Sequence, residues 1–377
     1  MILLSKTYLL PNSTIGIIGG GQLGRMMALA AKAMGFRVIV LDPTVDAPCG
    51  QVADEQIVAN YTDLVALKEL AEKSDVVTYE FENVDNDAIR SIEDIVRVPQ
   101  GSELLSITQD RILEKAYLES ININLAPYAV IVDKDDIVQH ISSLGYPAVL
   151  KTTQGGYDGK GQYVIQSEAD IDKALGLLRF GTCVLEAWIP YEREVSVIVA
   201  RNATGQVETF PVAENNHKNN ILHTTVVPAT LDTESVHEAE AIAVKLAEYL
   251  HLEGVLAVEM FVTSSGAIYV NELAPRPHNS GHFSIEACNI SQFTQHIRAI
   301  AGLPLLEVEL LRPAMMVNIL GQHVDGVNEV LGDHPEWFVH YYGKQEAKID
   351  RKMGHITVLS DNPLVELEKL RAMQIWS

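Results

Sequence analysis

The chain has 377 residues, of which 47% are hydrophobic and 21% charged, so it is long enough for two or three domains with large cores. Its formal net charge of −22 would repel nucleic-acid backbones and anionic membranes, so neither is expected as a partner. Three scattered cysteines, an N-terminus unlike a signal peptide and no apolar stretch of about 18 residues exclude a disulfide framework and a membrane span and predict a cytoplasmic protein with buried thiols.

The first hundred residues alternate short β-type runs with amphipathic helical runs, as parallel α/β units do. Helices are predicted over residues 22–34 and 64–73, and strands over residues 14–18, 37–41, 56–58, 76–80 and 96–98. The motif GGGQLG at residues 19–24 follows the first strand, and Asp42 ends the second. This is the dinucleotide-binding fingerprint, so a Rossmann-like first domain is predicted over residues 1–107.

From residue 108 the pattern becomes α+β and predicts a second domain that ends near residue 304. Helices are expected over residues 110–115, 135–143 and 235–249, and strands over residues 128–132, 149–151, 183–189 and 194–200. A hairpin is expected over residues 254–262 and 267–272. A smaller β-rich domain, residues 305–377, ends in a short helix over residues 364–373.

The segment KTTQGGYDGKGQ, residues 151–162, places four glycines and two lysines directly after a predicted strand. Glycine lets backbone N–H groups approach phosphate oxygens, and Lys151 and Lys160 add positive charge. The segment therefore predicts a loop that covers phosphates. The alternative is a plain hairpin tip, because glycine and charged residues also form ordinary turns.

Two glutamates lie on opposite arms of the hairpin predicted near residue 265. With the even-length loop suggested by Ser264 and Ser265, Glu259 and Glu272 share one face of the sheet, one diagonal step apart. Paired carboxylates repel unless a proton or cation lies between them, and oxygen ligands beside phosphates suit Mg²⁺. Asn271 falls on the other face but could reach a ligand at the strand end. The alternative is a solvated sheet face, which the apolar neighbours of the pair disfavour.

The hairpin leads into LAPRPHNSGH, residues 273–282, which offers a guanidinium, two imidazoles and an amide. Arg276 stands between two prolines that favour extended backbone, as a preset ligand for a small anion would. A basic cluster follows at residues 343–355, where Lys344, Arg351 and Lys352 could hold a phosphate. The alternatives are an ordinary turn for the first segment and a solvated basic face for the second.

The motifs GGGQLGRM, YEFENV, GGYDGKGQ, VNELAPRPHNSGHF and RKMGH stand in an order that resembles the ATP-grasp superfamily. Within it, the chain resembles the N5-carboxyaminoimidazole ribonucleotide synthetases of purine biosynthesis over essentially its whole length. The glycine motif alone is a weak signal, whereas NELAPRPHNSGH together with RKMGH is much more specific. The resemblance implies a central ATP-grasp domain over residues 108–304, split near residues 186–190.

This family resemblance also implies a reaction. ATP, bicarbonate and 5-aminoimidazole ribonucleotide give N5-carboxyaminoimidazole ribonucleotide, ADP and phosphate through carboxyphosphate. The chain would then be an ATP-dependent ligase that forms a C–N bond, uses Mg²⁺ and works as a homodimer.

The resemblance further implies a role for individual residues. ATP would contact Arg111, Lys151, Gly156, Tyr157, Asp158, Gly159, Lys160, Gly161, Gln162, Glu186, Ala187, Trp188, Ile189, Glu194, His217, Asn271 and Glu272. Mg²⁺ would bind Glu259 and Glu272, and bicarbonate and its phosphorylated form would bind the catalytic residues Arg276, His278 and Asn279. The aminoimidazole ribonucleotide would contact Gln22, Glu80, Asp158, Lys344 and Arg351, the last two at its phosphate. Asp158, in the glycine loop, is the catalytic candidate for accepting or orienting an amine proton.

Three rival functions remain open at this point. An NAD-dependent oxidoreductase would use the fingerprint and Asp42 but would leave the second glycine loop, the glutamate pair and the basic cluster without a role. Another ATP-grasp carboxylate–amine ligase, such as a formate-using or glycine-adding purine enzyme or a biotin carboxylase subunit, is nearer. A nonenzymatic ATP-binding regulatory module would need the same glutamates but no turnover.

Overall fold

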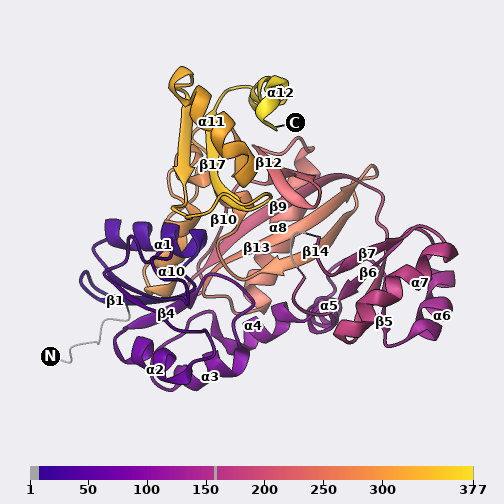
Figure 1. Cartoon of the computed structure of the whole chain (residues 1–377), viewed down its shortest axis with the longest axis horizontal. Coiled ribbons are helices and arrows are strands. Elements are labelled where there is room, and N and C mark those ends of the chain that lie inside the picture. Colours follow the sequence, from indigo (N-terminus) through magenta and orange to yellow (C-terminus); the bar gives the residue numbers. More distant parts are fainter. Residues whose placement is uncertain (1–7, 157–158, 377) are drawn as a thin grey trace.

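The computed structural model describes residues 8–156 and 159–376, so Tyr157 and Asp158 lie outside the described residues. In the part of the chain that is described, the strands form three sheets, and Figure 1 shows the lobes that surround the largest one. The first sheet is parallel and the other two are antiparallel. This arrangement confirms the predicted α/β fold with an α+β central part.

The first lobe is a four-stranded sheet in the order β3-β2-β1-β4. Its strands are β1 (Thr14–Ile18), β2 (Arg37–Leu41), β3 (Glu55–Ile57) and β4 (Val76–Tyr79), and its helices are α1 (Gln22–Ala33), α2 (Leu64–Glu72), α3 (Asn86–Glu93) and α4 (Gly101–Gln109). The central strands are almost wholly buried, as parallel strands covered on both faces must be. Asp63 and Asp85 accept backbone N–H bonds at the starts of α2 and α3, which fixes where these helices begin.

The prediction of a strand over residues 96–98 is wrong. Only an isolated bridge between Val76 and Arg97 forms, in which the Arg97 carbonyl accepts the N–H of Val77 at 2.9 Å. The chain then turns at once into α4, because Gly101 adopts a positive φ of 72° and donates its N–H to Val98. The apolar run is therefore too short to continue the ladder.

The second lobe, at the right in Figure 1, is a smaller sheet in the order β5-β8-β6-β7. Its strands are β5 (Tyr128–Ile131), β6 (Ala148–Thr152), β7 (Gln162–Ile165) and β8 (Cys183–Ala187). The helices α6 (Lys134–Leu144) and α7 (Ile171–Ala174) cover one face through an apolar cluster that includes Ile137 and Ile171. The predicted glycine loop is the connection between β6 and β7.

The large sheet has nine strands, eight of them in the order β14-β13-β9-β11-β12-β15-β17-β16 while β10 pairs with β9. Its strands are β9 (Tyr191–Arg201), β10 (Val207–Thr209), β11 (Ala213–Lys218), β12 (Ile221–Val227), β13 (Gly254–Thr263), β14 (Ile268–Ala274), β15 (Ala314–Leu320), β16 (Trp337–Tyr341) and β17 (Lys352–Leu359). The boundary predicted near residue 305 thus does not divide the sheet, since β12 pairs directly with β15.

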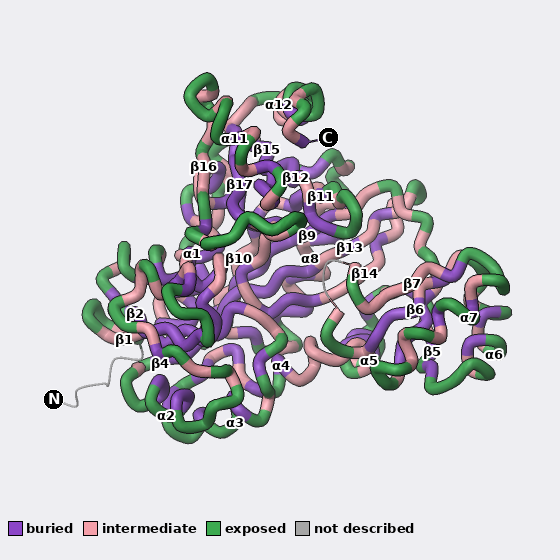
Figure 2. Tube along the Cα trace, viewed as in Figure 1, coloured by how far each residue is buried: buried purple, intermediate pink, exposed green. Residues whose placement is uncertain are grey.

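The remaining helices are α5 (Arg111–Ser120), α8 (Thr233–Tyr249), α9 (Ser284–Ala287), α10 (Gln292–Ile300), α11 (Val324–Val330) and α12 (Pro363–Ala372). Among them α10 joins the first lobe to the large sheet. Its Phe293 and Ile297 pack with Met27 of α1, while Ala299 packs with Ala257 of β13. Figure 2 shows β9 and β13 of the large sheet largely buried at the centre of the molecule.

The structure also bears on two further predictions from the sequence, which concern the cysteines and membrane-spanning helices. Cys49, Cys183 and Cys288 are buried and unbonded, which confirms the predicted core thiols. Among the described residues, none of the helices combines the length and the apolar character that a membrane crossing requires.

We predict that Ile297→Ala lowers the free energy of unfolding by about 2–5 kcal/mol, because the fully buried side chain would leave a cavity between α1 and α10. Ile349→Ala is the control, since that side chain is 78% exposed and should cost under about 0.5 kcal/mol. Urea unfolding of both variants measures the difference, and equal effects would contradict this packing role.

Candidate active site

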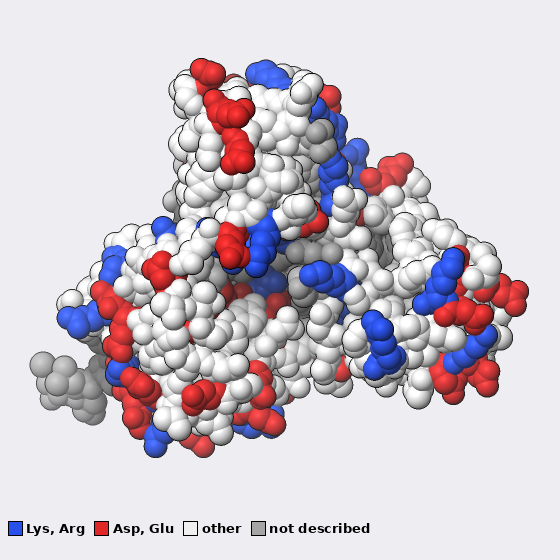
Figure 3. Space-filling view, in the orientation of Figure 1, with Lys and Arg blue, Asp and Glu red and all other residues white. Residues whose placement is uncertain are grey.

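A cavity of about 540 Å³ lies where the lobes meet, and Figure 3 shows the hollow with Lys and Arg side chains around it. Its lining contains most of the residues predicted to bind ATP, metal or bicarbonate. These are Arg111, Lys151, Gly156, Gly159, Lys160, Gln162, Glu186, Ala187, Trp188, Ile189, Glu194, His217, Glu259, Asn271, Glu272, Arg276, His278 and Asn279. The lining also includes Glu82 and Thr108 of the first lobe, so segments that are far apart in sequence and come from all three lobes share one space.

Gly155, Gly156, Gly159, Lys160 and Gln162, among the described residues of the glycine loop, line one side of this cavity. Gly159 has a positive φ of 77°, and a Cβ there would come within 2.5 Å of the Asn220 side chain. Gln162 also donates to Asn220 at 3.4 Å, so the loop of the small sheet touches the β11–β12 hairpin of the large sheet. Gly161 does not line the cavity; its carbonyl accepts the N–H of Thr152 and closes the β6–β7 hairpin.

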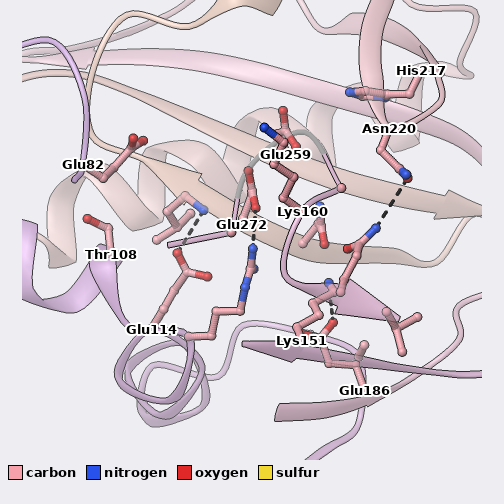
Figure 4. A pocket seen from close by; sticks show the side chains of 18 of the residues that line it. Glu82, Thr108, Glu114, Lys151, Lys160, Glu186, His217, Asn220, Glu259 and Glu272 are labelled. Atoms are coloured by element: carbon pink, nitrogen blue, oxygen red, sulfur yellow. Dashed lines mark hydrogen bonds and ion pairs between the residues drawn. The ribbon is translucent and has the colours of Figure 1, made fainter. Parts of the chain in front are cut away.

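Two lysines hold Glu186 on the floor of the cavity. Lys151 Nζ lies 2.9 Å from one carboxylate oxygen and Lys115 Nζ lies 3.1 Å from the other. Burial alone would raise the pKa of Glu186, but attraction to Lys151 and Lys115 lowers it to about 2. The carboxylate is therefore ionised throughout the neutral range, and Lys151 is held at the end of β6, beside the glycine loop (Figure 4).

The two predicted metal carboxylates face the cavity together, but not in the predicted register. Glu259 and Glu272 are direct partners across β13 and β14, not diagonal neighbours. The hairpin loop is odd in length, because Thr263 pairs with Ala267. With that register, strict alternation would have turned Glu272 to the other face of the sheet.

A β-bulge at Asn271 corrects the alternation. The pairing shifts by one residue between Glu259 and Met260, which leaves Asn271 as the extra residue on β14. Glu272 returns to the face of Glu259, and Asn271 lines the cavity beside it. The prediction that both glutamates share a face is thus confirmed, whereas the even-length loop and the diagonal spacing are wrong.

The charges of this carboxylate pair are only partly compensated by protein groups. Arg111 lies 3.3 Å from Glu272, and His278 Nε2 lies 3.4 Å from Glu259. Burial and then repulsion by Glu272 raise the pKa of Glu259 to about 7. Two half-buried carboxylates whose repulsion the protein compensates only in part fit a small divalent cation such as Mg²⁺, which needs one or two carboxylates when substrate phosphates complete its coordination.

The segment after β14 brings the predicted anion ligands to the same cavity. Arg276 Nε lies 2.8 Å from Glu82, and burial together with Arg276 lowers the pKa of His278, so its imidazole is neutral. Both polar atoms of the Asn279 amide are buried, and no group among the described residues bonds them. Such atoms are costly unless a ligand or water completes their hydrogen bonds.

A carboxylate–imidazole pair lines another wall of the cavity. Glu194 on β9 bonds His217 on β11. Burial would raise the pKa of Glu194, but the hydrogen bond and the charge of His217 lower it. The pair joins neighbouring segments of the large sheet beside the segment Glu186–Ile189.

The four described residues predicted for the ribonucleotide do not line this cavity. Gln22 is the first residue of α1, Lys344 donates to the carbonyl of Lys352 at 2.7 Å, and Arg351 donates to that of Glu346 at 3.0 Å. Lys352 is the residue of the basic cluster that reaches the cavity lining. The carbonyl bonds hold Lys344 and Arg351 to their own loop, which the sequence pattern could not reveal.

Glu80 decides against the dinucleotide interpretation of the first glycine motif. Its carboxylate accepts the N–H groups of Gly21 at 2.5 Å and Gly24 at 2.6 Å, at the start of α1. A pyrophosphate would need this same helix N-terminus. Asp42, which a ribose would need, is buried and accepts from Gly20 and Tyr61 instead. The backbone N–H groups of this motif are therefore bonded by the chain's own carboxylates, Glu80 and Asp42.

Several cavity residues were missed at the sequence level, although two signals were present. Glu114, which lines the cavity, and Lys115, which pairs with Glu186, stand three and four residues after Arg111 on one face of α5, which the spacing alone could have shown. Asn220 follows Asn219 in a two-residue hairpin turn with both φ angles positive, and Asn-Asn between β-type runs is a turn signal. Glu82 carries no such signal, because its partner Arg276 is remote in sequence.

Family models match three parts of the chain. A ribonucleotide synthetase preATP-grasp domain matches residues 12–109, an ATP-grasp domain matches residues 116–293, and a phosphoribosylaminoimidazole carboxylase C-terminal domain matches residues 314–369. Together with the glycine loop and the carboxylate pair, these matches define an ATP-grasp protein, and the chain is an ATP-dependent ligase.

Individual relatives narrow this class. The N5-carboxyaminoimidazole ribonucleotide synthase of Bacillus subtilis (strain 168) is 53% identical over 94% of both chains. A crystal structure of the ADP complex of an N5-carboxyaminoimidazole ribonucleotide synthetase is 55% identical, with a TM-score of 0.96 over 98% of both chains. The Aspergillus clavatus synthase in complex with ADP and 5-aminoimidazole ribonucleotide is 30% identical, with a TM-score of 0.89 over 97% of this chain and 98% of its own. The chain belongs to the N5-carboxyaminoimidazole ribonucleotide synthase family, as its motifs predicted.

We predict that Glu114→Gln reduces the loss of stability that the protein suffers as pH rises from about 5 to 8. Burial raises the pKa of Glu114 from its usual 4.5 to about 8. Between these values the unfolded chain has released a proton that the folded chain keeps, so folding stability falls as pH rises. Glutamine cannot titrate but still offers an oxygen to the N–H of Leu273, which Glu114 accepts at 3.1 Å.

Urea unfolding at several pH values measures this difference. The gap in free energy of unfolding between variant and unsubstituted protein should move in favour of the variant with rising pH. Parallel curves would contradict the raised pKa of Glu114.

Proposed function

We propose that the protein carboxylates 5-aminoimidazole ribonucleotide with bicarbonate and ATP, through carboxyphosphate, in purine biosynthesis. The observation that carries the proposal is the meeting of the Glu259–Glu272 pair, Lys151 and the Arg276–Asn279 segment in one cavity. A phosphate loop, a metal platform and a separate anion loop are what phosphoryl transfer to a small acid requires. A cytoplasmic homodimer is part of the same proposal.

ATP would lie with its adenine against the segment Glu186–Ile189 and its ribose near Glu194 and His217, all of which line the cavity. Its phosphates would meet Lys151, Arg111 and the glycine loop. Lys151 suits this role because Glu186 fixes its ammonium group in place, while Arg111 is already held on the cavity side of α5 by Glu272. Trp188 is 41% exposed and lines the cavity, so a base can approach its segment from that side.

Glu259 and Glu272 would hold Mg²⁺, with Asn271 beside them. Their paired oxygens and the raised pKa of Glu259 support this assignment. When bound, the ion neutralises negative charge on the phosphates. The ion would take the place of the proton that Glu259 otherwise keeps, and its positive charge would balance both carboxylates.

Bicarbonate would bind at Arg276, His278 and Asn279. The guanidinium of Arg276 supplies positive charge, the neutral imidazole of His278 can donate or accept, and the unbonded amide of Asn279 offers both kinds of group. A bicarbonate oxygen would attack the γ-phosphorus, the bond to ADP would break, and carboxyphosphate would form. Fixed charges in a site that excludes water favour this step.

The exocyclic amine of the ribonucleotide would then attack the carboxyl carbon, phosphate would leave, and the amine would lose a proton. CO₂ released inside the closed site would serve the same attack. Asp158 remains the predicted acceptor or orienting group for that proton, although it lies outside the described residues. Gln22, Glu80, Lys344 and Arg351 remain the residues predicted around the ribonucleotide, and Lys352 joins them because it lines the cavity.

We predict that the protein releases ADP at a substantial rate only when ATP, Mg²⁺, bicarbonate and 5-aminoimidazole ribonucleotide are all present. A coupled ADP assay with each component omitted in turn measures this. ADP release with formate or an amino acid in place of bicarbonate would favour another carboxylate–amine ligase, and binding of ATP without turnover would favour a regulatory module.

We also predict that Glu272→Gln lowers turnover by about 100-fold or more while leaving the thermal midpoint near that of the unsubstituted protein, because it removes one of the two carboxylates proposed to hold Mg²⁺ at the transferring phosphoryl group. Glu208→Gln is the control, since Glu208 lies on β10 of the same sheet but outside the cavity lining. Near-normal turnover of Glu272→Gln would show that this carboxylate is no essential ligand.

A further inference from the structure

A fully buried glutamine, Gln292, holds the backbone of the segment that carries the anion ligands. It is the first residue of α10. Its Oε1 accepts the N–H of His278 at 2.9 Å, and its Nε2 donates to the carbonyl of the same residue at 2.6 Å. One carboxamide therefore satisfies both backbone groups of His278.

Further bonds hold Gln292 itself against the loop. Its backbone N–H donates to Ser284 Oγ at 2.9 Å, and that hydroxyl donates to the carbonyl of Gly281 at 2.6 Å. Its Nε2 also lies 3.2 Å from Nδ1 of His282. A Cβ at position 281 would come within 2.6 Å of the Gln292 carboxamide, so glycine is required for this close approach.

The loop has no regular ladder that could do the same work. His278 follows β14, and buried backbone groups outside helices and sheets need other partners. A carboxamide suits this position because it offers an acceptor and two donors on one planar group. Leucine or methionine of similar size would leave the N–H and the carbonyl of His278 unsatisfied.

The backbone of His278 in turn sets the directions of the side chains that would meet bicarbonate. The ring of His278 points to Glu259 at 3.4 Å, and the Asn279 amide follows directly in the chain. A rotation of the peptide groups on either side of His278 would move both side chains, because they share this backbone. Gln292 touches neither the cavity nor the predicted anion, so it would act only through the loop.

We propose that Gln292 is a positioning residue, whose carboxamide clamps the backbone of His278 and so presents His278 and Asn279 to the small anion. This inference rests on the proposed function of the loop in binding bicarbonate. It adds a residue behind the loop that sets affinity for the anion without contacting it.

The chain contains a matched control on the same helix. Gln295 is also fully buried, and it makes the same two-point pairing with another backbone unit. Its Nε2 donates to the carbonyl of Leu306 at 2.5 Å, and its Oε1 accepts the N–H of Leu306 at 3.2 Å. Neither Gln295 nor Leu306 lines the cavity, so equal substitutions at 292 and 295 should separate positioning from stability.

The test compares Gln292→Glu with Gln295→Glu in the full-length protein, with KM for bicarbonate and KM for ATP measured from about pH 6.5 to 8.5. A protonated glutamic acid can still accept from the N–H of His278 and donate to its carbonyl, whereas a carboxylate cannot donate. Relative to the unsubstituted protein at each pH, KM for bicarbonate of Gln292→Glu should rise at least about tenfold across this range, and KM for ATP should stay within about twofold. Gln295→Glu should lower stability comparably but leave both KM values unchanged.

Equal KM profiles for the two variants, or parallel losses for ATP and bicarbonate, would overturn the inference. If Gln292→Glu does not fold, Ser284→Ala decides, because it removes only the hydroxyl between Gln292 and Gly281. That variant should raise KM for bicarbonate about fivefold, as expected for a lost neutral hydrogen bond, and an unchanged value would overturn the inference.

The unsubstituted protein in the same assay keeps the two proposals apart. Absence of bicarbonate-dependent turnover there would sink the proposed function and this inference with it. If the unsubstituted protein shows normal bicarbonate-dependent turnover but the variants show no change in KM for bicarbonate, only the proposed role of Gln292 is wrong.

Discussion

The opposition of Glu259 and Glu272 across one hairpin is the constraint around which the site is built. Burial, and then repulsion between these partly exposed carboxylates, raises the pKa of Glu259. The surrounding charges answer this repulsion: Arg111 pairs with Glu272, and His278 approaches Glu259. A protein with no use for a cation here would gain stability from a less acidic pair, so the arrangement indicates a site prepared for positive charge.

The remaining buried charges tie separate parts of the fold to this pair. Helix α5 contributes Arg111 to the large sheet and Lys115 to Glu186 of the small sheet, while Glu82 of the first lobe pairs with Arg276. Together these pairs connect the first lobe, the small sheet and the large sheet around the cavity. A ligand that bridges these groups would therefore bind the lobes together, which is how water can be kept from a reactive acyl phosphate.

Helices and strands can be predicted from the sequence where local patterns determine them. The prediction is less accurate where contacts between remote segments determine the structure. Apolar runs and helical spacing locate β1, α1 and the hairpin near residue 265, because burial of a continuous face selects those conformations. Residues 96–98 fail because the chain turns into α4 before a ladder can form. The same limit applies to Gln292, because the sequence around this glutamine does not indicate that its side chain binds the backbone of His278.

Register is the other limit, and the site shows its consequence. The sequence assigns both glutamates to one face, but for the wrong reason, because an odd loop and a bulge at Asn271 replace the even loop. One residue more or less reverses every side chain on a strand, so short turn sequences cannot settle such a question. The first glycine motif is a similar case: its form is that of a dinucleotide site, yet Glu80 fills the helix N-terminus, which is a contact set by the fold.

The central claim is that this site transfers the γ-phosphoryl group of ATP to bicarbonate, with release of ADP, before the carbon of bicarbonate reaches the amine. Bicarbonate labelled with ¹⁸O tests it most directly, because the oxygen that attacks the γ-phosphorus stays with phosphorus when phosphate leaves. Mass spectrometry of the phosphate from a single turnover, run too quickly for the label to exchange with water, should find one ¹⁸O atom per phosphate. Phosphate without label, formed while the ribonucleotide is carboxylated, would contradict the account.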